Sequence, residues 1–184
     1  KVKTIQQRFI EEIKAKFPLH KFERTAPILN KQRMIKSQEE IEVTKQACDI
    51  TAEAFRRCLK TVRPDVYEYQ IQAEIEYIFK YNGANGHAYY PIVAAGKNAC
   101  CLHYSANNSV LKDGDLILFD IGCEYKNYSS DLSRTIPING KFTERQKECY
   151  NAVLSVMKEI TKLYKVGGTI DEVNQSTYKK KKKE

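Results

Sequence analysis

Residues 119–135 read Phe119-Asp-Ile-Gly-Cys-Glu-Tyr-Lys-Asn-Tyr-Ser-Ser-Asp-Leu-Ser-Arg-Thr135. The segment begins at the end of the continuous apolar run Leu116-Ile-Leu-Phe119, which predicts a strand. Extended structure with an internal turn is predicted to continue to Ile138, so the segment is expected to form a hairpin. Aspartate is disfavoured in strands and costly to bury without a partner, which makes Asp120 and Asp131 the candidate site residues.

The position of the hairpin turn determines how the two aspartates face each other. A two-residue loop at Tyr125–Lys126 places Asp120 directly opposite Asp131, whereas a loop at Lys126–Asn127 makes them diagonal neighbours on the same face. Their Cβ atoms would then be about 4.5–5.5 Å apart in the first register and up to about 8 Å apart in the second. Because like charges repel at this spacing, a shared proton, a basic side chain or a metal must offset them. Two divalent ions about 3.5–4 Å apart, bridged by one carboxylate, would fit.

Plainer interpretations of these residues remain open at this stage. Asp131 could cap a turn, and Arg134 is close enough in sequence to pair with either aspartate. His103, in the run Cys101-Leu-His-Tyr104, is a second candidate, although a histidine among apolar residues at a strand end is more often structural. A phosphate-binding G-x-x-x-x-G-K-[ST] loop and a G-x-S-x-G nucleophile elbow are both absent.

The flanking sequence predicts helices on both sides of the hairpin. Apolar spacing predicts a helix from Ile5 to Phe17, and residues 22–36 are expected to form an extended connector because of Pro27. Paired capping residues are expected to open three further helices: Ser37 with Glu40, Asp65 with Glu68, and Thr143 with Gln146. Between the second and third helices, residues 88–95 and 100–104 are short β-type runs. The order of the elements predicts an α+β fold with mostly antiparallel strands.

Composition limits the possible classes of protein. With 184 residues, 42% of them hydrophobic, the chain is long enough for one domain with a core, and it contains no apolar run long enough to span a membrane. These features predict a soluble protein. Lys179–Lys183 and Glu184 carry half of the net charge of +8, and such a run is more often a solvated tail than a nucleic-acid arm. The six cysteines form no C-x-x-C pair, which favours reduced thiols in the cytoplasm over a zinc site.

Several linked motifs resemble the Xaa-Pro aminopeptidases (aminopeptidase P), a metallopeptidase family with the pita-bread fold. These motifs are Met34-Ile-Lys-Ser-Gln-Glu-Glu-Ile41, Cys101-Leu-His-Tyr104, Asp113-Gly-Asp-Leu116, Asp120-Ile-Gly-Cys-Glu-Tyr125, Ser130-Asp-Leu-Ser-Arg-Thr135 and Asn139-Gly-Lys-Phe142. The resemblance covers roughly residues 27–175. It implies the first half of a pita-bread domain, an antiparallel-rich sheet with flanking helices.

The resemblance also implies roles for individual residues. Asp120 and Asp131 match the family's two metal-binding aspartates, of which the second bridges two Mn²⁺ ions, and His103 matches the active-site histidine that helps hold the substrate. The implied reaction removes an N-terminal residue linked to proline, by attack of a metal-activated hydroxide on the peptide carbonyl. The implied substrates are peptides with proline in second position, and neither a membrane nor a nucleic acid is expected as a partner.

The same resemblance predicts that ligands are missing. The family's other three ligands, a His and two Glu, come from the second half of the fold, and nothing after Gln175 can supply them. The expected organisation is the end of a preceding domain plus connector (1–36), the first half of the metallopeptidase domain (37–175) and a lysine-rich tail (176–184). Such a fragment is expected to have little activity alone, and a complementary chain or a second copy could cover its apolar faces. The alternative function is a non-catalytic binding module for protein or nucleic acid.

Overall fold

The computed structural model describes the backbone of residues 2–181 and the side chains of residues 2–177, and the chain divides into two units, residues 1–42 and 43–184. In the first unit, α1 (Ile5–Lys16) confirms the helix predicted there. The predicted extended connector at residues 22–36 is wrong, because α2 (Ala26–Met34) occupies most of it. Pro27 lies in the first turn of α2, where a helix needs no backbone N–H donor. Neither helix has a buried residue.

Four more helices follow: α3 (Gln38–Thr61), α4 (Glu68–Tyr81), α5 (Glu144–Thr161) and α6 (Ile170–Lys181). The capping pairs predicted before α3 and α5 are confirmed by reciprocal hydrogen bonds. The predicted cap of α4 is wrong, since Tyr67 and not Asp65 precedes its first turn. Tyr67 pairs with Val110 in an isolated antiparallel bridge, so its backbone is extended and the helix begins only after it.

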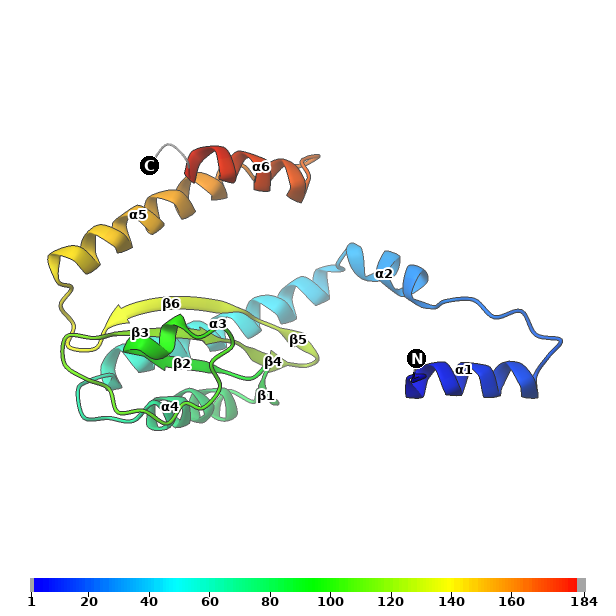
Figure 1. Cartoon of the computed structure of the whole chain (residues 1–184), viewed down its shortest axis with the longest axis horizontal. Helices are drawn as coiled ribbons and strands as arrows, with labels where there is room; N and C mark the ends of the chain where they lie inside the picture. The colour runs from blue at the N-terminus through cyan, green and yellow to red at the C-terminus, as the bar shows by residue number, and fades with distance from the viewer. Residues whose placement is uncertain (1, 182–184) are drawn as a thin grey trace. The chain divides into compact units, whose positions relative to one another are not determined.

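The strands form two antiparallel three-stranded sheets (Figure 1). One sheet has the order β1 (Gly86–His87), β4 (Cys123–Tyr125), β5 (Tyr128–Ser129), and the other has the order β2 (Ile92–Ala95), β3 (Leu116–Ile121), β6 (Leu132–Pro137). The β-type run predicted at residues 100–104 is wrong, because the short helix η1 (Gly96–Cys100) and a turn occupy this segment. Gly96 has a left-handed φ of +54°, which turns the chain directly after β2.

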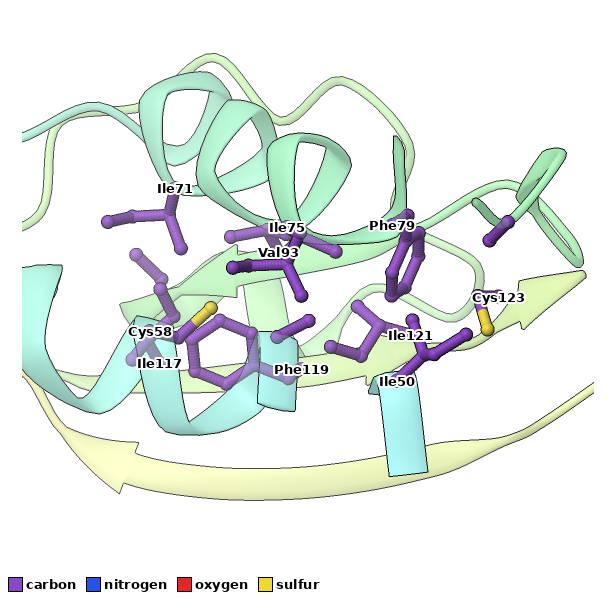
Figure 2. Packing of buried hydrophobic residues seen from close by; sticks show 14 of the residues in the cluster. Ile50, Cys58, Ile71, Ile75, Phe79, Val93, Ile117, Phe119, Ile121 and Cys123 are labelled. Carbon is purple, nitrogen blue, oxygen red and sulfur yellow. The ribbon is translucent and has the colours of Figure 1, made fainter. Parts of the chain in front are cut away.

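The core lies between α3, α4 and one face of the second sheet. Figure 2 shows Phe119 of β3 among side chains of α3 and α4, and its ring meets Phe55 edge to face, 5.7 Å between centroids. Buried and partly buried residues alternate along β3, so Ile117, Phe119 and Ile121 point into the core. Asp120 therefore lies on the opposite face of the sheet.

The backbone of α6 continues to Lys181, across the predicted start of the tail at residue 176. The rest of the lysine run, residues 182–184, lies outside the described residues. None of the helices in the described part of the chain combines the length and apolar character needed to cross a membrane.

Candidate metal centre

Asp120 and Asp131 are diagonal neighbours across the hairpin. The turn is at Lys126–Asn127, where both residues have left-handed φ values of 49° and 67°. Tyr125 pairs with Tyr128 in the first sheet, and Asp120 pairs with Ser133 in the second, in the same register. Asp131 lies two residues before Ser133 and so shares a face with Asp120. Of the two registers that the sequence allowed, the structure has the second.

Both aspartates lie where the chain passes from one sheet to the other. Asp120 is the second-last residue of β3, two residues before Gly122, which separates β3 from β4, and Asp131 stands between β5 and β6. Gly122 is in close contact with the returning strand, since a Cβ added to it would lie 1.9 Å from the carbonyl oxygen of Ser130. The absence of a side chain at Gly122 therefore lets the two strands approach at the site.

Tyr89 joins the two aspartates. It lies between β1 and β2, and its hydroxyl oxygen is 2.8 Å from Oδ1 of Asp120 and 3.0 Å from Oδ1 of Asp131. A phenol has one hydrogen to donate, so it can satisfy only one of these carboxylates at a time. Burial, the hydrogen bond to Asp120 and the charge of Asp120 raise the pKa of Tyr89, and Asp131 adds to the effect. Tyr89 thus remains a neutral donor between two acceptors.

Among the residues that the structure describes, no cationic side chain forms an ion pair with either carboxylate. Arg134, which the sequence allowed as a partner, instead donates from Nη1 to the carbonyl oxygen of Ser133 at 2.7 Å. A pair of hard oxygen donors that lacks a positive partner suits a divalent cation such as Mn²⁺ or Mg²⁺.

His103 is not joined to the aspartates. It lies exposed in the turn after η1 with a left-handed φ of 54°, and the described contacts include no hydrogen bond or ion pair to its ring. Within the described residues, no group of three or more His, Cys, Asp or Glu side chains could hold a metal ion. These residues therefore supply two carboxylate ligands and a nearby phenol.

An apolar cavity of about 570 Å³ lies on the Asp120 side of the sheet. Leu118 and Ser133 line it from β3 and β6, and Tyr150 and Val153 line it from α5. Because side chains alternate along a strand, Leu118 and Asp120 point to the same face of β3. Neither aspartate lines this cavity, so it adjoins the candidate metal centre without containing it.

Tyr89 is the site residue that sequence reasoning missed. The run at residues 88–95 was recognised as β-type, but nothing local distinguishes Tyr89 from Tyr90. The signal that would have found it is the pairing of Ile92 with Asp120, which brings the start of β2 next to the aspartates.

Comparisons with known proteins identify the family of this chain. The sequence profile of metallopeptidase family M24 matches residues 42–181. The Xaa-Pro aminopeptidase of Escherichia coli is 44% identical over 147 residues, which are 80% of this chain and 33% of the relative. The Xaa-Pro dipeptidase of Pyrococcus horikoshii is 34% identical over 166 residues, 90% of this chain and 47% of the relative. The chain thus spans about a third to a half of the length of these curated relatives.

Solved structures show the same similarity. A structure of an aminopeptidase P candidate from Bacillus anthracis matches with a TM-score of 0.90 at 34% identity, covering 97% of this chain and 43% of that one. A variant of Escherichia coli aminopeptidase P in complex with substrate matches with a TM-score of 0.81 at 42% identity, covering 83% of this chain and 35% of that one.

Proposed function

The chain belongs to metallopeptidase family M24, and from that premise we propose that Asp120 and Asp131 are ligands of a two-Mn²⁺ centre that removes N-terminal residues from Xaa-Pro peptides. The similarity to aminopeptidase P structures confirms the predicted α+β fold as part of a pita-bread domain. Because the chain covers only part of its relatives, the activity and the substrates are the proposal.

The observation that carries this proposal is the convergence of two carboxylates on one neutral hydroxyl. The two Oδ1 atoms lie within 3.0 Å of the same Tyr89 oxygen and lack an ion-pair partner among the described residues. Like charges held this close raise the free energy of the fold unless a cation binds between them. Carboxylates are ligands that Mn²⁺ accepts readily, whereas zinc and copper favour nitrogen and sulfur.

Each residue of the proposed site then has its own role. When bound, the metal ions would supply Lewis acidity and lower the pKa of a bound water. Asp120 and Asp131 would be the metal ligands, and Tyr89, which donates to one carboxylate at a time, would orient them. We propose that His103, which is exposed in its turn, binds the peptide and donates towards its carbonyl oxygen.

Metal binding by this chain is proposed to be weak. Two carboxylates fill only part of a divalent ion's coordination shell, and the described residues contain no cluster of three ligands. We therefore expect a Kd for Mn²⁺ of about 10⁻⁴ M or weaker and little hydrolysis by the chain alone. The remaining His and two Glu ligands of the family site would have to be supplied by a complementary segment.

Mn²⁺ binding to the purified chain tests the proposal. Electron paramagnetic resonance measures the fall in the free Mn²⁺ signal, and an Xaa-Pro peptide assay runs in parallel. Asp120→Asn and Asp131→Asn should each weaken binding about tenfold or more, because each removes a charged ligand. Asp113→Asn is the matched control, since this exposed aspartate only accepts from Asn139. Equal binding by all four proteins would refute the proposal.

The expected alternative, a binding module for protein or nucleic acid, has no support in the matches reported above, whose names are all those of peptidases. We therefore retain the peptidase as the single proposed function.

A cytoplasmic location is also proposed. It is supported by the cysteines, all six of which are free thiols.

A further inference from the structure

Glu68 is a carboxylate that the proposed reaction does not use, and it is completely buried. It is the first residue of α4, and its exposed fraction is 0%. Its place in the first turn of a helix favours a negative charge, because the helix dipole is positive there. A buried charge nevertheless needs hydrogen-bond donors to offset its loss of hydration.

Four donors surround this carboxylate. Oε1 accepts from the backbone N–H of Ala95 at 2.7 Å and from Nδ2 of Asn98 at 3.0 Å. Oε2 accepts from the hydroxyl of Tyr104 at 2.7 Å and from the backbone N–H of Ser109 at 2.9 Å. Each carboxylate oxygen therefore accepts one hydrogen bond from a backbone amide and one from a side chain.

Three of these donors belong to the segment that contains His103. Asn98 lies five residues before His103, Tyr104 directly follows it, and Ser109 closes the segment. Nδ2 of Asn98 also lies 3.1 Å from the hydroxyl oxygen of Tyr104 and 2.9 Å from Oγ of Ser109. Its two hydrogens can serve two of the three acceptors at a time, so Asn98 links this group of residues to Glu68. The turn between them has no other regular structure, and the described contacts of the His103 ring include no hydrogen bond.

We propose that Glu68 is a positioning residue for His103: it clamps both ends of the segment 98–109 and thereby sets where the histidine stands. The inference rests on the proposed function for the claim that His103 meets a substrate. The clamp itself is a property of this chain and needs neither metal nor peptide.

The clamp requires a carboxylate. The two backbone amides, of Ala95 and Ser109, bind different oxygens of Glu68, and a backbone N–H can only donate. Glutamine presents one oxygen and one NH₂ group, so in either orientation one amide would face another donor. Glu68→Gln therefore keeps the size of the side chain but removes the acceptor either from the amide of Ala95, just before the segment, or from the amide of Ser109, at its end.

Nuclear magnetic resonance of the ring nitrogens tests the clamp, because the chain has three histidines. In Glu68→Gln the His103 signals should shift or broaden. His87, which contacts Phe79 and Glu76, and His20, in the first unit, should keep theirs. Amide exchange at Ala95 or Ser109 should become about tenfold faster. Glu74→Gln is the matched control, since Glu74 lies on the same helix and forms a surface ion pair with Arg57.

Unchanged His103 signals and unchanged amide exchange in a folded Glu68→Gln protein would overturn the inference. If the signals of His87 and His103 collapse together, the variant has unfolded, and Tyr104→Phe decides instead. That change removes one donor from the segment and leaves α4 intact. A shift of His103 alone then supports the clamp, and no shift overturns it.

The two proposals fail in different ways. If Mn²⁺ binding is insensitive to Asp120→Asn, the metal centre fails and the His103 spectra are unaffected. If the His103 spectra are insensitive to Glu68→Gln and Tyr104→Phe, the clamp fails and Mn²⁺ binding is unaffected.

Discussion

Two carboxylate regions of the same unit differ in how the chain surrounds them. Glu68 lies inside the fold and accepts from four donors, two of them backbone amides. Asp120 and Asp131 lie on the open face of the sheet and share one hydroxyl. Glu68, whose hydrogen bonds are all supplied by its own chain, stabilises the fold. Asp120 and Asp131, which share a single donor, are able to bind a cation.

Position in the fold explains this difference. Glu68 stands where a helix begins against the end of β2, and the backbone N–H groups of Ala95 in β2 and of Ser109 in a loop both point at it. The aspartates stand where both sheets are interrupted, and the backbone groups of the strands beside them point sideways to neighbouring strands, in the plane of the sheet, and not to the carboxylates. The following predictions test this contrast.

The largest expected effect is on stability at the buried region. Glu68→Ala should lower the free energy of unfolding by about 3–5 kcal/mol, because it leaves four buried or partly buried donors without their acceptor. Asp120→Asn, the comparison variant, should change it by less than about 1 kcal/mol, since it removes charge repulsion while it weakens one hydrogen bond. Urea unfolding without metal measures both. Equal losses in the two variants would contradict the contrast.

A smaller effect is expected at the sheet junction. Gly122→Ala should cost about 2–3 kcal/mol, because its Cβ would overlap the carbonyl of Ser130 and push the strands apart. The control is Gly140→Ala, where a Cβ meets nothing within 4 Å and only the φ of +76° causes strain of about 1 kcal/mol. Thermal unfolding compares the two. If Gly140→Ala costs as much as Gly122→Ala, the close approach is not what Gly122 provides.

The smallest expected effect is a dependence on pH at Tyr89. Because the pKa of Tyr89 is raised in the folded chain, its contribution to stability is complete below about pH 10 and is lost as the pH rises further, where the unfolded tyrosine ionises. Without metal, the stability advantage of the wild type over Tyr89→Phe should shrink by less than about 1 kcal/mol at pH 11, as the group is only partly buried. Tyr90→Phe, at an exposed neighbouring residue, is the matched control. An advantage that grows with pH would exclude this explanation.

The sequence predicted the hairpin and its two aspartates because both depend on local signals. An apolar run marked β3, and alternation placed the acidic residues on one face. The choice between two registers depended on which residues adopt left-handed φ values. Asn127 tolerates that conformation better than Tyr125, a signal that favours the observed turn.

The remaining features depend on contacts between distant parts of the chain. Tyr89 meets residues 31 and 42 positions away, and Glu68 meets residues 27 to 41 positions away, so no window of sequence contains either set. Glu68 was expected only as part of a capping pair. The difference at α2 has another cause: a proline disfavours the interior of a helix, but Pro27 occupies the first turn, which tolerates it.

Because the register is the same throughout the hairpin, it determines which insertions and deletions would keep both aspartates on one face. Ten residues separate Asp120 from Asp131. One residue inserted into either strand would turn Asp131 towards the face that carries Phe119, whereas residues added at the tip beyond Tyr125 and Tyr128 would leave both carboxylates in place. We therefore expect insertions and deletions to be tolerated at the tip, or in pairs, because an even number of strand residues keeps both carboxylates on one face.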